Sequence, residues 1–122
     1  MNFHYGKTLG IALVSVLCLT PRLGHAASYA PLDCAKASTS AETTVCKTYA
    51  LGQEEARLAT LFGVLTSLVA MGQRADIVDA QRRWVFVREA CGNNADCLSR
   101  VYQTRINELS QALDDLAKRG PF

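Results

Sequence analysis

The stretch 81–102 constrains the fold of this chain more than any other part, because it contains a helix end, a turn and a helix start. An apolar helical pattern runs up to Cys91, and Gly92 follows with the freedom that a left-handed helix end requires. Asn94 can then cap a new helix through its side chain. Cys91 and Cys97 therefore lie on either side of a tight reversal, close enough to form a disulfide.

Capping and periodicity signals place the other helices. Thr39 and Glu42 form a capping box, which predicts the start of a short helix. The long helices are expected over about Tyr49–Met71, Arg74–Cys91 and Ala95–Lys118. Gly72 is expected to end the first of them. Because short connections make neighbouring helices antiparallel, the sequence predicts an all-α fold: a small antiparallel bundle of three main helices plus a short N-terminal helix.

Residues 1–26 have the features of a secretory signal peptide. A short positive region precedes the apolar run Leu9–Leu19, whose 11 residues are too few to span a bilayer. We expect cleavage after Ala26, a periplasmic or secreted location, and no membrane span in the mature form. Cys18 offers a lipoprotein alternative, which we do not favour because Leu17 stands where a lipidation motif requires a small residue.

The expected mature part, residues 27–122, has the size of one domain, since removing 26 of the 122 residues leaves 96. The chain has 13 basic and 11 acidic residues, but Lys7 and Arg22 lie in the predicted signal peptide. The domain therefore has 11 of each and a net charge of zero. A neutral domain lacks the positive field that nucleic-acid binding requires, so we expect no nucleic-acid partner.

The two histidines, His4 and His25, also lie in the predicted signal peptide. The domain therefore lacks the commonest general base and the commonest metal ligand. We expect it not to be an enzyme, with no catalytic residue, no cofactor and no metal.

Four cysteines remain in the domain: Cys34, Cys46, Cys91 and Cys97. An even number in a small exported domain predicts a disulfide framework. Four cysteines allow three pairings. We favour the two local disulfides, Cys34–Cys46 and Cys91–Cys97. A four-cysteine zinc site is the alternative, although spacings of 11 and 5 intervening residues do not resemble the short ligand pairs of zinc sites.

Polar side chains interrupt the core-facing side of each long helix. They are Glu55 in the first, Gln81 and Arg88 in the second, and Arg105 in the third. An unpaired buried charge is costly, so these side chains need partners. Counting residues from the turns places Glu55 beside Arg88, and Gln81 beside Arg105. We interpret the four as a structural polar network.

An ordered series of motifs resembles the LprI-type lysozyme-inhibitor N-terminal domain family. The first motif is the segment C-A-K-A-S-T from Cys34, with Glu42 and Cys46. The second is Leu51, Glu55, Leu58 and Phe62. The third is Gln81, Arg82, Trp84, Arg88, Glu89, Cys91 and Gly92. The fourth is Cys97, Leu98, Tyr102, Arg105, Ile106 and Leu109.

The resemblance covers Cys34 to about Leu116 and departs from the family pattern at Glu55, Glu89 and Phe62, where the family has Asp, Asp and Tyr. It implies a small exported helical domain and, through the family's name, inhibition of lysozyme.

Phe86 is expected on an outer face of its helix, on the side that carries Arg82 and Glu89. An aromatic side chain between charges can anchor a protein interface, so these three residues are the candidate interaction site. The alternative, which we favour, is that the N-terminal lead-in or the first helix covers Phe86.

These observations predict an exported, non-catalytic protein-binding domain, with lysozyme inhibition as the activity that the resemblance implies. The partner would be a lysozyme or another envelope protein. The alternative is a periplasmic interaction or structural module that inhibits no lysozyme. Animal-type lysozymes are cationic, and this neutral domain supplies no acidic field to attract them. Its overall charge is therefore compatible with an interaction module that inhibits no lysozyme.

Overall fold

The structure, a computed structural model, describes residues 31–119. The predicted signal peptide, with Cys18, both histidines and the cleavage position after Ala26, lies outside these residues. The elements, in chain order, are the 3-10 helix η1 (Cys34–Lys36), α1 (Ser40–Lys47), α2 (Tyr49–Leu68), α3 (Met71–Ala90) and α4 (Ala95–Lys118). Every element between residues 31 and 119 is helical, so the prediction of an all-α fold is confirmed.

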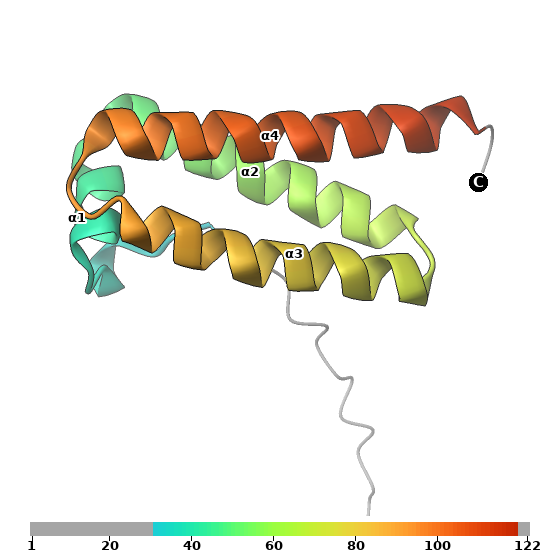
Figure 1. Ribbon diagram of the computed structural model, residues 1–122, viewed down its shortest axis with the longest axis horizontal. Coiled ribbons are helices and arrows are strands. Elements are labelled where there is room, and N and C mark those ends of the chain that lie inside the picture. Colours follow the sequence, from blue (N-terminus) through green and yellow to red (C-terminus); the bar gives the residue numbers. More distant parts are fainter. Residues whose placement is uncertain (1–30, 120–122) are drawn as a thin grey trace, which may run out of the picture.

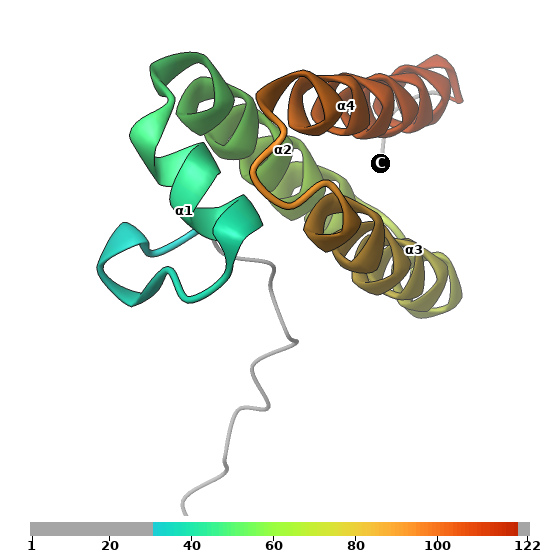
Figure 2. The same cartoon turned by 60° about the vertical axis from the view of Figure 1, so that its left-hand side comes forward.

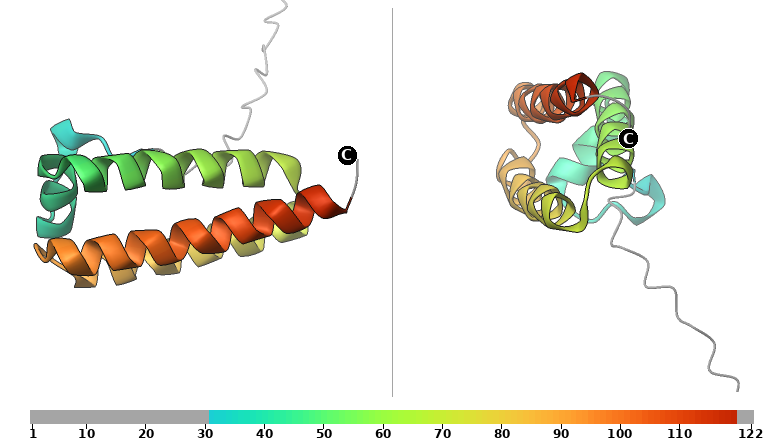
Figure 3. Two further views of the ribbon diagram at one scale, coloured as in Figure 1. Left: turned by 90° about the horizontal axis from the view of Figure 1, so that it is seen from above. Right: turned by 90° about the vertical axis from the view of Figure 1, so that its right-hand side faces the viewer.

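Three long helices form the body of the domain. α2, α3 and α4 run lengthwise, each antiparallel to the one before it, and α1 lies across one end (Figure 1). Figure 2 brings that end forward, where α1 contacts all three long helices. α2 lies on one side of the bundle, and α3 and α4 lie on the other (Figure 3). The predicted arrangement of three main helices plus a short N-terminal helix is confirmed.

The capping box at the start of α1 is present as the sequence predicts. The backbone N–H of Glu42 donates to Thr39 Oγ1 at 3.1 Å, and the backbone N–H of Thr39 donates back to Glu42 Oε2 at 3.2 Å. These bonds satisfy two backbone donors that a helix start otherwise leaves free. Glu42 Oε2 also accepts from the backbone N–H of Ser38 at 2.8 Å, so the carboxylate fixes the lead-in to α1 as well.

The connection between α2 and α3 differs from the prediction. We expected Gly72 to end the first long helix, but α2 ends at Leu68 and Gly72 lies in the first turn of α3. The chain reverses through Val69 and Ala70, which are both extended. Val69 is 8% exposed and belongs to the core. Burial of this side chain therefore turns the chain, and no left-handed glycine is needed.

The connection between α3 and α4 follows the prediction. Gly92 has a φ of +56°, the left-handed conformation that favours glycine. Asn94 caps α4, because its Oδ1 accepts from the backbone N–H of Cys97 at 3.0 Å. Cys91 is bonded to Cys97, and Cys34 is bonded to Cys46.

Both favoured local disulfides are thus confirmed. All four cysteines of the expected mature part are used in them, which rules out the four-cysteine zinc alternative.

The core lies between α2, α4 and the inner face of α3. Its largest fully buried side chains include Tyr102, Phe62 and Leu58. Trp84 packs edge-on against Tyr102, with ring centroids 5.0 Å apart and planes at 73°. None of the helices within residues 31–119 is long and apolar enough to cross a membrane.

Candidate functional site

A buried carboxylate, Glu55 of α2, lies where the lead-in and the three long helices meet. Its side chain is 5% exposed. Glu55 Oε2 accepts a hydrogen bond of 2.5 Å from the hydroxyl of Tyr102 in α4, and lies 3.9 Å from Arg88 Nη1 in α3. Glu55 Oε1 accepts from the backbone N–H of Leu32 at 3.0 Å. The neighbouring positions that the register predicted for Glu55 and Arg88 are present, and the contacts of Tyr102 and Leu32 are additional.

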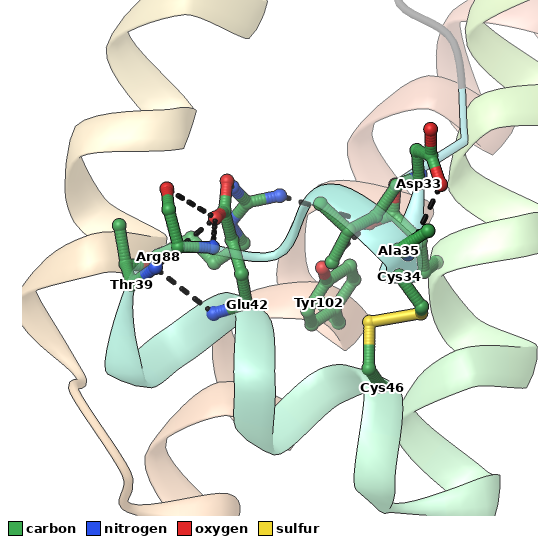
Figure 4. Close-up of a disulfide and its surroundings, with 11 residues drawn as sticks. Asp33, Cys34, Ala35, Thr39, Glu42, Cys46, Arg88 and Tyr102 are labelled. Atoms are coloured by element: carbon green, nitrogen blue, oxygen red, sulfur yellow. Dashed lines mark hydrogen bonds and ion pairs between the residues drawn. A yellow bond between two sulfur atoms is a disulfide. The ribbon is translucent and has the colours of Figure 1, made fainter.

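Arg88 is the positive centre of the same network. Its Nη2 lies 2.6 Å from Glu89 Oε1 and 3.7 Å from Glu42 Oε1 of α1, while its Nε donates to Glu89 Oε1 at 3.0 Å. The guanidinium lies over the Trp84 ring, 5.7 Å from its centroid. Figure 4 shows Glu42 and Arg88 facing each other beside the Cys34–Cys46 disulfide. Arg88 is therefore held from several sides by carboxylates and an aromatic face.

The pKa of the Glu42 carboxyl group is lowered because this side chain caps α1. The backbone N–H groups of Ser38 and Thr39 stabilise the ionised carboxylate and hold the pKa of Glu42 below its ordinary value, and Arg88 lowers this pKa further. The same side chain thus caps α1 and faces the buried cation of α3. Ionised Glu42 links the N-terminal part of the domain to the bundle.

A second buried cation, Arg105 of α4, is held farther along the bundle. Its Nε donates to Gln81 Oε1 at 3.0 Å, and its Nη1 donates to Glu108 Oε2 at 2.9 Å. Its Nη2 lies 3.5 Å from the backbone carbonyl oxygen of Ile77. Gln81 and Arg105 are therefore neighbours, as the register predicted.

Each residue of the predicted polar network is buried, and each makes contacts within the domain. Sequence reasoning missed the contributions of Tyr102, Glu42, Trp84 and Glu89 to this network. A signal was present for Tyr102, which lies on the same face of α4 as Arg105. The contact of Glu42 with Arg88 was not predictable from the capping motif, because a capping box gives no information about a distant arginine.

Phe86 is an exposed aromatic residue of α3. It is 76% exposed, so the prediction that the lead-in or the first helix covers it is wrong. The reason is geometric: α1 lies across the end of the bundle and meets α3 through Arg88, and residues two positions apart on a helix point to nearly opposite sides. The next residue, Val87, is 52% exposed, so two apolar side chains lie together on the surface.

The other two residues of the candidate interaction site lie in different surroundings. Arg82 is exposed and pairs with Asp79 one turn away, at 2.8 Å. Glu89 is only partly exposed, and its carboxylate is engaged by Arg88. The structure therefore leaves Phe86 and Arg82 on the surface and places Glu89 at the edge of the buried network.

These features define a class: a small, disulfide-stabilised helical domain whose buried charges hold the helices together. A family model described as "Lysozyme inhibitor LprI" matches residues 34–109. The chain belongs to this family, as the motifs in its sequence indicated.

Curated relatives support the same assignment. The chain is 32% identical over 84 residues to the proteins named "Lipoprotein LprI" of Mycobacterium bovis and Mycobacterium tuberculosis. The match covers 66% of this chain and 41% of each relative, so the chain spans less than half the length of these proteins. No solved structure matches the chain.

Proposed function

We propose that this protein is an exported, non-catalytic inhibitor that binds a lysozyme through the outer face of α3. The observation that carries the proposal is the exposed pair Phe86 and Val87 in a domain of the lysozyme-inhibitor family. Exposed aromatic side chains beside arginine are typical of the residues that dominate binding energy at protein interfaces. Because α3 is packed against the bundle and followed by a disulfide-bonded turn, little conformational freedom would be lost on binding.

The two carboxylates Glu55 and Glu42 favour a binding role over a catalytic one. General acid–base catalysis needs a carboxyl group that can reach substrate. Glu55 is buried and accepts hydrogen bonds from Tyr102 and Leu32, and Glu42 is occupied by the capping box. These groups are used to hold the fold.

Export is supported by the two disulfides, which persist in oxidising compartments such as the periplasm. We propose cleavage of the signal peptide after Ala26. Mass spectrometry of the protein purified from the cell envelope tests this, because a chain that begins at Ala27 is expected. A lipid-modified chain that begins at Cys18 would contradict the proposal.

Inhibition itself is tested by the lysis of a peptidoglycan suspension. A panel of lysozymes is used, with and without the oxidised exported protein, and turbidity is followed over time. We expect dose-dependent protection against at least one lysozyme class. Absence of protection at a large molar excess, with helicity verified by circular dichroism, would contradict the proposal for the enzymes tested.

A second candidate is an envelope interaction module that inhibits no lysozyme. One observation favours it: the match covers only 41% of the relatives, so an inhibitory segment of those proteins can lie outside the region that this chain shares. Retention of an envelope protein other than lysozyme on the immobilised domain, together with a negative lysis assay, is the result expected for this candidate.

A further inference from the structure

We propose that two copies of this domain associate through the face that α3 and α4 share, related by a two-fold axis that crosses the middle of that face. The face contains a groove with a volume of about 460 Å³, formed by residues of these two helices. The inference goes beyond the proposed function, because the partner is a second copy of this chain and no lysozyme is required.

The groove has apolar walls that a single copy leaves open to solvent. Ala80, Trp84 and Val87 line it from α3, and Val101 lines it from α4. Val87 is 52% exposed. Two antiparallel helices with an open groove between them form one half of an antiparallel four-helix bundle. The same two helices of a second copy supply the other half, with the groove-lining side chains of both copies at the centre.

Charges of both signs lie along the same face. Arg83, Arg100 and Glu108 line the groove. Asp76 precedes Arg83 by seven residues, which is two helical turns, so it lies on the same side of α3. Within residues 31–119 the two arginines and Asp76 are exposed and form no ion pair. Glu108 pairs with Arg105, and its side chain is still 56% exposed. A face with available charges of both signs can be complementary to itself, as a two-fold interface requires.

The spacing of the charges on α4 defines where the axis lies. Thr104 follows Arg100 by four residues, precedes Glu108 by four residues, and lines the groove as well. A two-fold axis that crosses α4 at Thr104, at right angles to the helices, sets this helix beside the α4 of the second copy in antiparallel order. Arg100 of each copy then lies opposite Glu108 of the other copy.

The same axis pairs the charges on α3. Ala80 lies 12 residues before Gly92 and Thr104 lies 12 residues after it, so the axis crosses α3 near Ala80 because the two helices are antiparallel. Arg83 follows Ala80 by three residues, and Asp76 precedes it by four. These two residues of different copies therefore lie opposite each other to within one residue, which is about 1.5 Å along the helix. One axis thus gives both unpaired arginines an acidic partner.

The face has the size of a weak interface. α3 has 20 residues, and its length is about 30 Å. Two helices side by side are about 20 Å wide, which gives an area on the order of 600 Å² per copy. A standard interface buries about 800 Å² per partner, so we expect a dissociation constant in the micromolar range. The expected mature part has a net charge of zero, so two copies do not repel each other as a whole.

Phe86 lies at the edge of this face. It is one residue from Val87, about 100° around the helix, on the opposite side of Val87 from Trp84. It is not among the residues that line the groove. The dimer therefore keeps the Phe86 ring outside its buried centre, and dimer formation can be tested separately from lysozyme binding.

A charge swap on α3 tests the inference. Sedimentation equilibrium of the oxidised exported protein over a range of concentrations gives the monomer–dimer dissociation constant. We expect Asp76→Arg and Arg83→Asp each to weaken the dimer at least about fivefold, because each places like charges opposite one another. The double variant restores opposite charges and should return to within about twofold of the wild type.

The matched control is Arg57→Asp. Arg57 is an exposed arginine of α2, which lies on the other side of the bundle, and it forms no ion pair among the described residues (Figure 3). It should dimerise within about twofold of the wild type. Circular dichroism verifies that each variant is folded. Where a variant on α3 does not fold, Arg100→Glu takes its place, and the same weakening is expected because Glu108 of the second copy lies opposite.

A wild type that stays monomeric up to about millimolar concentration, well above the micromolar range expected for this area, would overturn the inference. A dimer that the single variants do not weaken, or that the charge swap does not restore, would overturn it too. Weakening by the control as large as that by the single variants would assign the effect to overall charge and overturn it as well. The lysis assay is scored separately: a monomer that protects peptidoglycan overturns the dimer alone, and a dimer that protects none overturns the proposed function alone.

Discussion

Arg88 of α3 lies 3.9 Å from Glu55 of α2, and both side chains are 5% exposed. The pair connects two helices, and Tyr102 attaches the third through its hydrogen bond to the same carboxylate. Because charges removed from water are costly unless they are paired, this contact specifies how the three long helices align. Glu42 and Glu89 also lie beside Arg88, so the positive charge of Arg88 keeps two carboxylate partners when Glu55 is removed.

Removal of the buried carboxylate is expected to destabilise the domain strongly. Glu55→Ala should lower the free energy of unfolding by about 3 kcal/mol, near the lower end for a broken buried pair, because Arg88 keeps its other carboxylates. Urea unfolding followed by circular dichroism measures this. Asp114→Ala, at an exposed position of α4, is the control and should change stability by less than about 0.5 kcal/mol. A loss below about 1 kcal/mol for Glu55→Ala would mean that the pair behaves as an exposed one.

Stability should fall in acid because of Glu42. Its pKa is lowered in the folded state, so the stabilisation is complete above the ordinary value of 4.5 and is lost as the pH falls toward the folded value. We therefore expect wild type to be more stable than Glu42→Gln at pH 7, with the difference shrinking below about pH 4.5. Unfolding midpoints of both proteins from pH 7 to pH 3 test this. A difference that is independent of pH would contradict the role of the ionised carboxylate.

The two disulfides are expected to contribute similar amounts. Replacing Cys34 and Cys46 together by serine should cost about 3 kcal/mol, and replacing Cys91 and Cys97 together about 2.4 kcal/mol, from the loop lengths alone. Removing the first pair also frees η1 from α1. Urea unfolding of each double variant, compared with the oxidised wild type, provides the test. An unchanged midpoint for either variant would show that its disulfide does not constrain the unfolded chain.

Two glycines should respond in opposite directions to alanine. Gly92 has a φ of +56°, so Gly92→Ala should cost about 1–2 kcal/mol, the left-handed penalty of an L residue. Gly63 lies within α2 with open space around its Cα, so Gly63→Ala should stabilise the domain by about 1 kcal/mol. Thermal unfolding of both variants distinguishes them. A stabilising Gly92→Ala would contradict the described turn.

The sequence predicted an element best where a capping side chain marks its start. The bounds of α4 agree with the prediction, because Asn94 caps its start. The end of α2 was misplaced because Gly72 resembles a stop signal, whereas burial of Val69 decides where the chain turns.

The pairing of residues between helices was predictable from register. The orientation of individual side chains was not. Counting from the turns brought Glu55 to Arg88, because helices of fixed rise stay aligned along the bundle. The hydrogen bond from Tyr102 depends on side-chain rotamers that no pattern encodes. The exposure of Phe86 depends on where α1 docks, which is a property of the whole fold.

The most direct test of the account is calorimetric titration of a lysozyme with the oxidised exported protein and two variants. Phe86→Ala removes the exposed ring of α3, and Tyr49→Ala removes an aromatic ring that is 84% exposed at the start of α2. We predict saturable binding by wild type, a loss of at least about tenfold for Phe86→Ala, and no more than about a twofold change for Tyr49→Ala. Equal binding by wild type and Phe86→Ala would contradict the assignment of α3 as the binding face. No binding by the wild type to any lysozyme would contradict the inhibitor account itself.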